Sequence, residues 1–184
     1  MGGEDIDDTL YVGLVCTGES APNRVVYINA GTSSASGGWS ADKELLSVTD
    51  AALRAVQVSM GGRHACMVNG VGGVQCWGSN AAGQLGNGTT ITSNVPVQVT
   101  GLVSGVIEVE ASRTDRTNVD TLSSCALLAN GTVRCWGDGS RGQLGRGDTT
   151  DSTTPVQVET SAGVPLANVT QIAAGINHFC AISA

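Results

Sequence analysis

The sequence predicts an all-β protein made of repeated four-stranded antiparallel sheets, and two observations lead to this prediction. The first is composition: 26 of the 184 residues are glycine, whereas aromatic residues make up 3% and charged residues 14%. Such a composition favours short strands and tight turns over helical bundles. The second is an internal repeat. CWGSNAAGQLGNG at residues 76–88 returns as CWGDGSRGQLGRG at residues 135–147, and PVQV follows each copy. Repeats with strand signals indicate stacked blades or a solenoid.

Each repeat begins with a β-hairpin. In the first copy the apolar run CMV leads into the turn NGVGG, and VQCW at 74–77 is the return strand. Glycine and asparagine suit the positive φ angles of such turns. In the glycine-rich loop that follows, we expect Leu85, and Leu144 in the second copy, to fill apolar space. PVQV is then a third strand, opened by a proline where no ladder donor is needed.

A fourth strand completes each unit, and we assign VIEVEA at 106–111 to one unit and VTQIAA at 169–174 to the next. Four strands per unit are typical of a β-propeller blade, so we expect a partial ring of about three blades. The expected segments are a degenerate blade or N-terminal extension at 1–54, propeller repeats at 55–105 and 106–168, and the first strands of a further blade at 169–184.

Four of the six cysteines share one spacing. Cys66 and Cys76 are ten residues apart, as are Cys125 and Cys135, so each pair should lie opposite across the two strands of a hairpin. Cross-strand neighbours come close enough for a disulfide. A zinc site is the rival interpretation, but zinc knuckles use tighter spacing such as C-x2-C. We therefore predict two disulfides, and neither a metal nor another cofactor.

Cys16 and Cys180 are left over. Sliding the repeat back places Cys16 over Cys66 and Val26 over Cys76, as in a worn blade. The two cysteines could bond each other when the chain ends meet, bond another chain, or have partners in a longer polypeptide. A short ring leaves exposed strand edges, which tend to pair. We therefore expect a homo-oligomer or part of a longer chain rather than a self-closed monomer.

Charge and hydropathy exclude two classes of partner. The formal net charge is −7, so a nucleic-acid backbone would be repelled. The sequence has no apolar run that is long enough to span a membrane. The acidic start MGGEDIDDT lacks the features of a signal peptide, so either the protein stays inside the cell or the signal was removed. Because disulfides persist in oxidising compartments, we favour an extracellular or cell-surface location.

The repeat also resembles a known family. H-x-C, G-x-V-x-C-W-G, G-Q-L-G-x-G and P-V-Q-V, in this order, are similar to the regulator of chromosome condensation repeats, over residues 55–158 and on into 169–184. The resemblance implies propeller blades that form rings of seven in this family. The paired cysteines resemble the disulfide-bearing type of bacterial secreted and surface proteins. Family members include nucleotide exchange factors and β-lactamase inhibitors, so the fold alone does not identify a partner.

Two pairs of repeat residues invite a functional interpretation. His64 and His178 occupy the same repeat position and suggest a catalytic pair, but residues at such positions usually pack the blades, and we expect a structural role. We expect Trp77 and Trp136 to pack between blades as well, with the indole N–H bonded to a neighbouring carbonyl. Sugar stacking on these rings is the alternative.

The stretch SRTDRTNVDT at 112–121 is an insertion relative to the first repeat. Insertions in repeat proteins map to loops, often on a binding face. The candidate binding residues are Arg113, Asp115, Arg116, Asp120 and Arg141. With no nucleophile–base set or open metal site in the pattern, we expect no enzyme. The predicted function is a binding scaffold that contacts a protein or glycan through loops. The alternative is a structural subunit of a surface or filament assembly, in which partial propellers complete one another across chains.

Overall fold

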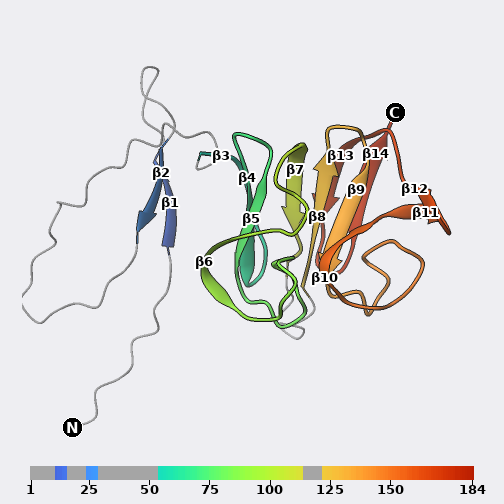
Figure 1. The fold of residues 1–184 in the computed structure, drawn as a ribbon, viewed down its shortest axis with the longest axis horizontal. Coiled ribbons are helices and arrows are strands. Elements are labelled where there is room, and N and C mark those ends of the chain that lie inside the picture. The colour runs from blue at the N-terminus through green and yellow to red at the C-terminus, as the bar shows by residue number, and fades with distance from the viewer. Residues whose placement is uncertain (1–10, 16–23, 29–53, 114–121) are drawn as a thin grey trace, which may run out of the picture. The chain divides into compact units, whose positions relative to one another are not determined.

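The computed structural model describes residues 11–15, 24–28, 54–113 and 122–184, and all regular structure in these residues is β (Figure 1). The chain divides into two compact units, residues 1–50 and 51–184. None of the described residues forms an apolar helix of membrane-spanning length.

The N-terminal unit contains one described hairpin, in which β1 (Tyr11–Val15) pairs antiparallel with β2 (Arg24–Ile28). Val26 pairs with Gly13 in this hairpin. The alignment of Cys16 with Cys66 places Val26 at the position of Cys76, which would pair Val26 with Cys16. Because Val26 pairs with Gly13 instead, the strand register contradicts this alignment. The same register pairs Val15 with Arg24. Cys16 itself and the predicted helical turns after residue 40 lie outside the described residues.

The second unit contains two four-stranded antiparallel sheets and one two-stranded sheet of the same kind. The first sheet has the order β3 (Ala55–Met60), β4 (His64–Asn69), β5 (Val74–Gly78), β6 (Ser93–Gln98). The second has the order β7 (Val106–Ala111), β8 (Ser123–Leu128), β9 (Val133–Gly137), β10 (Ser152–Gln157). The third pairs β13 (Val169–Ala174) with β14 (Phe179–Ser183), and the short strands β11 (Glu159–Ser161) and β12 (Val164–Pro165) form a separate hairpin.

VIEVEA and VTQIAA do not close the hairpin unit that precedes each of them in the chain, and each instead begins a sheet that starts at the expected segment boundary, 106 or 169. VIEVEA is β7, and it pairs with β8 in the second sheet rather than closing the first. VTQIAA is β13, and it pairs with β14 in the third. β7 and β13 are therefore the first strands of the second and third sheets. The physical reason is the turn before it: residues 99–105 leave the edge strand β6 and lead to the next sheet, with positive φ angles of 72° at Gly101 and 78° at Gly105.

The proline of PVQV does not open its strand, as the sequence had suggested. β6 begins at Ser93 and β10 at Ser152, three residues before Pro96 and Pro155. The ladder is irregular there, since the register shifts between Cys76 and Gly78 in the first sheet and between the equivalent pairs in the second. Both strands lie at a sheet edge. An edge position with a bulge accommodates a residue that donates no backbone hydrogen bond.

The hairpins β4–β5 and β8–β9 carry the two predicted disulfides. Cys66 bonds Cys76 and Cys125 bonds Cys135, with Cα–Cα distances of 4.1 and 4.0 Å. Each pair lies directly opposite in the strand register. Both bonds lie in hydrophobic core clusters. Leu85 and Leu144 are 0% and 1% exposed, so the glycine-rich loops do place a leucine in the core, as expected.

Successive sheets dock through the first strand of each. β7 contacts β3 and β4, and β13 contacts β7 and β8 (Figure 1). The Gln57 side chain accepts a hydrogen bond from the N–H of Val109 at 2.9 Å and donates one to its carbonyl at 2.8 Å. Glu108, at the equivalent position, accepts one from the N–H of Ile172 at 3.0 Å. The repeat therefore builds two equivalent junctions, one between sheets one and two and one between sheets two and three.

Candidate binding site

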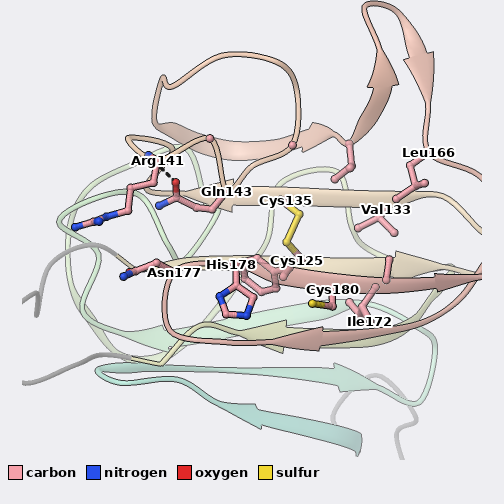
Figure 2. A pocket seen from close by; sticks show the side chains of 15 residues that line it. Cys125, Val133, Cys135, Arg141, Gln143, Leu166, Ile172, Asn177, His178 and Cys180 are labelled. Carbon is pink, nitrogen blue, oxygen red and sulfur yellow. Dashed lines mark hydrogen bonds between the residues drawn. A yellow bond between two sulfur atoms is a disulfide. The ribbon is translucent and has the colours of Figure 1, made fainter.

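A pocket of about 300 Å³ lies between the second sheet and the β13–β14 hairpin (Figure 2). Figure 2 shows Arg141, Gln143 and Asn177 at one end and Leu166 at the other, with the Cys125–Cys135 disulfide in the wall between them. His178, directly before β14, and Cys180 within β14 also line the pocket. The pocket therefore combines one polar end with a largely apolar wall, a combination typical of small binding sites.

The polar end is held by the second GQLG loop. Gln143 Oε1 accepts a hydrogen bond from the backbone N–H of Arg141 at 2.8 Å, and Gln143 Nε2 donates to the Asp138 carboxylate. Gly142, with φ of 78°, adopts a left-handed conformation that a side chain would strain. The loop thus fixes the backbone from which the Arg141 side chain extends.

The equivalent site at the first junction is filled by Trp136. Its side chain is 0% exposed and belongs to the same core cluster as Leu85, Val99 and Leu102. The indole N–H donates a hydrogen bond of 2.9 Å to the Gln84 carbonyl, as the sequence analysis expected. A Cβ atom added to Gly86 would lie 2.7 Å from Trp136 Nε1, so the glycine makes room for the ring. With no exposed surface, this ring is not available for sugar stacking.

The strand register shows that the pocket is the repeat of this filled site. Gln143, Gly145 and Val158 occupy the positions of Gln84, Gly86 and Val99. Leu166 corresponds to Leu102, because the two backbone N–H groups donate to Val158 and Val99 respectively. Val99 and Leu102 are 0% and 1% exposed, whereas Val158 and Leu166 are only partly buried. The second site therefore has the wall of the first without the tryptophan that covers it.

Comparisons with known proteins identify the family of this repeat. Two family models, both described as the regulator of chromosome condensation (RCC1) repeat, match the chain, the first at residues 72–114 and 130–182 and the second at 55–84. The first alone covers more than half of the 184 residues. The chain belongs to the RCC1 repeat family. The Ultraviolet-B receptor UVR8 of Arabidopsis thaliana is 32% identical over 131 residues, 71% of this chain and 28% of the receptor.

Solved RCC1-type structures agree with the fold. Human WBSCR16 matches with a TM-score of 0.58 and 27% identity, over 70% of this chain and 30% of that one. Prp20p of Saccharomyces cerevisiae matches with a TM-score of 0.51 and 26% identity, over 69% of this chain and 30% of that one. The prediction of β-propeller blades is thus confirmed. This chain spans less than a third of each relative named here. These relatives are eukaryotic, and the resemblance to a bacterial secreted type stays a prediction.

The two histidines of the RCC1 repeats occupy different environments. His64 is 4% exposed, and its Nε2 lies 2.8 Å from Ser124 Oγ at the first junction. Burial lowers the pKa of the His64 imidazole to about 4, so the ring is neutral at neutral pH. His178 is exposed and lines the pocket. His64 lies at the first sheet junction and His178 lines the pocket at the second, and the blade-packing role of the two stays a prediction.

The remaining cysteine and tryptophan assignments have different outcomes. Cys180 is free and exposed, and it lies in the wall of the pocket. The alternative in which Cys16 bonds Cys180 stays a prediction, because Cys16 lies outside the described residues. Trp77 is 6% exposed, consistent with packing.

Of the insertion at 112–121, only Ser112 and Arg113 lie in the described part of the chain. Arg113 is exposed, and its backbone N–H donates to the Gly175 carbonyl at 3.1 Å, beside the turn that precedes His178. Asp115, Arg116 and Asp120 lie outside the described residues. Leu122, which directly follows the insertion, accepts a hydrogen bond at its carbonyl from the N–H of Asp138 at 2.9 Å. Arg141 lines the pocket, whereas Arg113 is not among the lining residues.

The carboxylates of the second loop serve the loop itself. Asp151 accepts a hydrogen bond from the N–H of Gly139 at 2.9 Å, and Asp148 accepts one from Arg146 Nε at 2.8 Å. Hydrogen bonds from Thr150 and Arg146 lower the pKa of Asp148, so it stays ionised. Within the described residues, no three metal-ligating side chains gather.

Proposed function

We propose that this chain is a non-catalytic protein-binding scaffold of RCC1 blades, and that the pocket beside β14 is its contact site. The pocket is the observation that supports the proposal. Trp136 fills the equivalent site at the first sheet junction, whereas the pocket at the second junction has a partly buried apolar wall and is lined at one end by Arg141. An apolar wall with a few fixed polar groups suits a protruding side chain of a partner protein.

Related proteins support a protein partner rather than a small substrate. The structural study of Prp20p describes its binding to Gsp1p and histones. The present chain shares the blades of such proteins over less than a third of their length, so the partner of this chain is identified by its own pocket and not by theirs. A glycan partner has weaker support, because Trp77 and Trp136 are both buried.

The arrangement of His64 and Ser124 supports a non-catalytic role. Ser124 Oγ donates a hydrogen bond to the Gln84 carbonyl at 3.0 Å, so His64 Nε2 must be the donor to Ser124. A general base would instead accept the serine proton. Both side chains are also buried, Ser124 completely, so no substrate reaches the hydroxyl. The pair stabilises the junction between the first two sheets.

We also propose an extracellular or cell-surface location, on the basis of the two disulfides. Thiol labelling of the protein as isolated from its native cells tests this, since Cys66, Cys76, Cys125 and Cys135 should all resist alkylation. Labelling of these four residues in protein that has not been treated with a reductant would contradict the location.

The structural-subunit alternative has one observation of its own. Among the described residues, β14 pairs with β13 alone, and a free strand edge can pair with another chain. Light scattering on the purified protein distinguishes the two functions. A discrete oligomer favours the assembly, whereas a monomer favours the scaffold.

The contact site is tested with two matched arginine variants. Arg141→Ala introduces the residue that the first repeat carries at this position, Ala82, and Arg146→Asn introduces the equivalent of Asn87. Each removes one positive charge from the same loop, but Arg141 lines the pocket whereas Arg146 pairs with Asp148. A partner protein retained on the immobilised native chain should be lost with Arg141→Ala and kept with Arg146→Asn. Equal retention on all three proteins would refute the pocket as the contact site.

A further inference from the structure

The turns of the two disulfide-bearing hairpins share one backbone geometry. The strand registers align the turn at 69–73 in the first sheet with the turn at 128–132 in the second. Gly72 and Gly131 occupy the same position in these turns, with φ angles of 78° and 77°. The two turns therefore differ in their side chains rather than in their conformation.

The side chains of the second turn form an acceptor sequence for N-linked oligosaccharides. The turn reads Asn-Gly-Thr at 130–132, whereas the first has Val-Gly-Gly at 71–73. Asn130 Oδ1 accepts hydrogen bonds from the Thr132 N–H at 3.1 Å and from the Thr132 hydroxyl at 2.7 Å. Asn130 Nδ2, the atom to which such an oligosaccharide is attached, forms no hydrogen bond within the described residues. Attachment therefore leaves both hydrogen bonds of the turn in place.

Asn130 is exposed, and this exposure is a property of the repeat. Val71, at the same position of the first sheet, is 48% exposed although the second sheet packs against the first. A bulky, solubilising group requires such a surface position. β9 begins at Val133, directly after the turn, and ends at Gly137, directly before the Arg141 loop. The Asn130 turn and the proposed contact site thus lie at opposite ends of β9.

A second acceptor sequence lies beside the first. It consists of Asn168, Val169 and Thr170, and the N–H of Val169 donates to the Gly131 carbonyl at 3.0 Å. Asn168 occupies the position of Gly105 and has a φ of 56°, the only positive φ at a non-glycine residue in the described part of the chain. Asparagine tolerates this conformation, whereas glycine adopts it without strain. The second sheet junction therefore has two acceptor asparagines at positions where the first junction has none.

The third acceptor sequence of the chain, at Asn87, is built into its loop. Asn87 Oδ1 accepts hydrogen bonds from Asn80 Nδ2 at 3.3 Å and from Thr89 Oγ1 at 2.9 Å. The N–H of the next residue, Gly88, donates to the Thr153 carbonyl in the second sheet at 2.9 Å. Asn87 is also only partly exposed. These contacts place Asn87 against a neighbouring sheet, which favours Asn130 as the attachment point.

We propose that Asn130 carries an N-linked oligosaccharide, and that this end of the second sheet faces solvent rather than a partner. The inference rests on the proposed extracellular or cell-surface location, because this modification belongs to exported proteins. The donor is an oligosaccharide linked to a lipid diphosphate. Asn130 Nδ2 forms a bond to the anomeric carbon of the sugar. The bond from that carbon to the diphosphate oxygen breaks, the diphosphate keeps its electron pair, and one Nδ2 proton passes to a base.

Peptide mapping of the protein isolated from its native cells tests the proposal. The protein is digested, and the peptide that contains residue 130 is analysed by mass spectrometry before and after treatment with peptide N-glycosidase in heavy-oxygen water. The untreated peptide should carry the added mass of an oligosaccharide. The enzyme should remove this mass and leave a heavy-oxygen-labelled aspartate at position 130.

Three matched variants, produced in the same cells, identify the acceptor sequence. Asn130→Val and Thr132→Gly introduce the residues of the first turn, Val71 and Gly73, so both variants should fold. Each should lose the whole added mass. Thr132→Ser should keep it, because serine also provides the hydroxyl that the acceptor sequence requires. Resistance of the disulfide cysteines to alkylation verifies that each variant is folded.

Three results would overturn the inference: an unmodified Asn130 in the native protein, an added mass that persists in Thr132→Gly, and attachment at Asn87 or Asn168 without attachment at Asn130. Thiol labelling separates this failure from a failure of the proposed location. An unmodified Asn130 with four resistant cysteines would reject the oligosaccharide and keep the location, whereas labelled cysteines would reject both. A modified Asn130 without an Arg141-dependent partner would keep the inference and reject the contact site.

Discussion

The first and second sheet junctions are built from the same repeat and differ in one side chain. At the first, Trp136 covers Val99 and Leu102 and donates to the Gln84 carbonyl. At the second, Val158, Leu166 and the Gln143 carbonyl form the same wall without a tryptophan. A packing surface and a binding surface can therefore share one sequence motif. In the described residues, the two junctions differ in whether a tryptophan covers this apolar wall.

The largest expected effect is a loss of stability when the indole ring of Trp136 is removed. Trp136→Ala should lower the free energy of unfolding by about 3–5 kcal/mol, because it leaves a cavity among Leu85, Val99 and Leu102. Urea denaturation measures the loss. If this variant does not fold, Trp136→Phe should fold with a smaller loss. A cost below about 1 kcal/mol would mean that the ring does not hold the junction.

The second effect is a dependence of stability on pH at the first junction. The pKa of His64 is about 4 in the folded protein and 6.5 in the unfolded chain, so only the unfolded chain gains a proton between these values. Stability should therefore be constant above pH 6.5 and fall by about 3 kcal/mol as the pH drops to 4. Urea titrations at a series of pH values measure this loss.

The matched variants for the pH effect use both histidines. His64→Gln should flatten the dependence between pH 6.5 and 5. His178→Ser, which introduces at the exposed position the residue found at Ser123, should leave it intact. Burial raises the pKa of Glu110, and a raised carboxyl pKa acts in the opposite direction, favouring the folded state at lower pH. An unchanged slope in His64→Gln would assign the dependence to other groups.

The disulfides should contribute equally to the two complete sheets. Each closes a loop with a sequence separation of 10, so the Cys66→Ala/Cys76→Ala pair and the Cys125→Ala/Cys135→Ala pair should each cost about 2–3 kcal/mol. Thermal unfolding of the two double variants provides the comparison. A much larger cost for the second pair would show that the pocket wall depends on its disulfide more than loop closure explains.

The smallest expected effect is that of Leu166→Ala, which is compared with the same change at its equivalent, Leu102. Leu102→Ala should cost about 2–4 kcal/mol, because the residue is 1% exposed under Trp136. Leu166→Ala should cost less than half as much, since the residue is only partly buried beside the open pocket. Equal costs in denaturant titrations would indicate that the second junction is closed in solution.

The sequence predicted the features that depend on local spacing. The cysteine pairs, the core leucines of the GQLG loops and the indole hydrogen bond of Trp136 all follow from a hairpin with a short turn and a ring packed between blades. The strand with which VIEVEA pairs does not follow from local spacing, although the expected boundary at 106 places VIEVEA in the second repeat. This strand lies between two hairpins in the chain, and only tertiary pairing decides between them.

The pocket was not predicted, although Arg141 and Cys180 in its wall were singled out. The alignment of the two repeats contained the signal, because Gln143 and Gly145 repeat Gln84 and Gly86. Trp136 covers Gln84 and Gly86, whereas no tryptophan among the described residues covers Gln143 and Gly145. Partial burial of Val158 and Leu166 depends on that difference in tertiary packing, which no local pattern encodes.

The Gln57 and Glu108 contacts determine the order in which blades can follow one another. The amide of Gln57 satisfies both the N–H and the carbonyl of Val109, whereas the carboxylate of Glu108 can accept only the N–H of Ile172. If the second blade were duplicated into the place of the first, a carboxylate oxygen would face the Val109 carbonyl. Exchange of these two blades by recombination would therefore remove a hydrogen bond at the residue 57 position. This contact favours the present order of the blades.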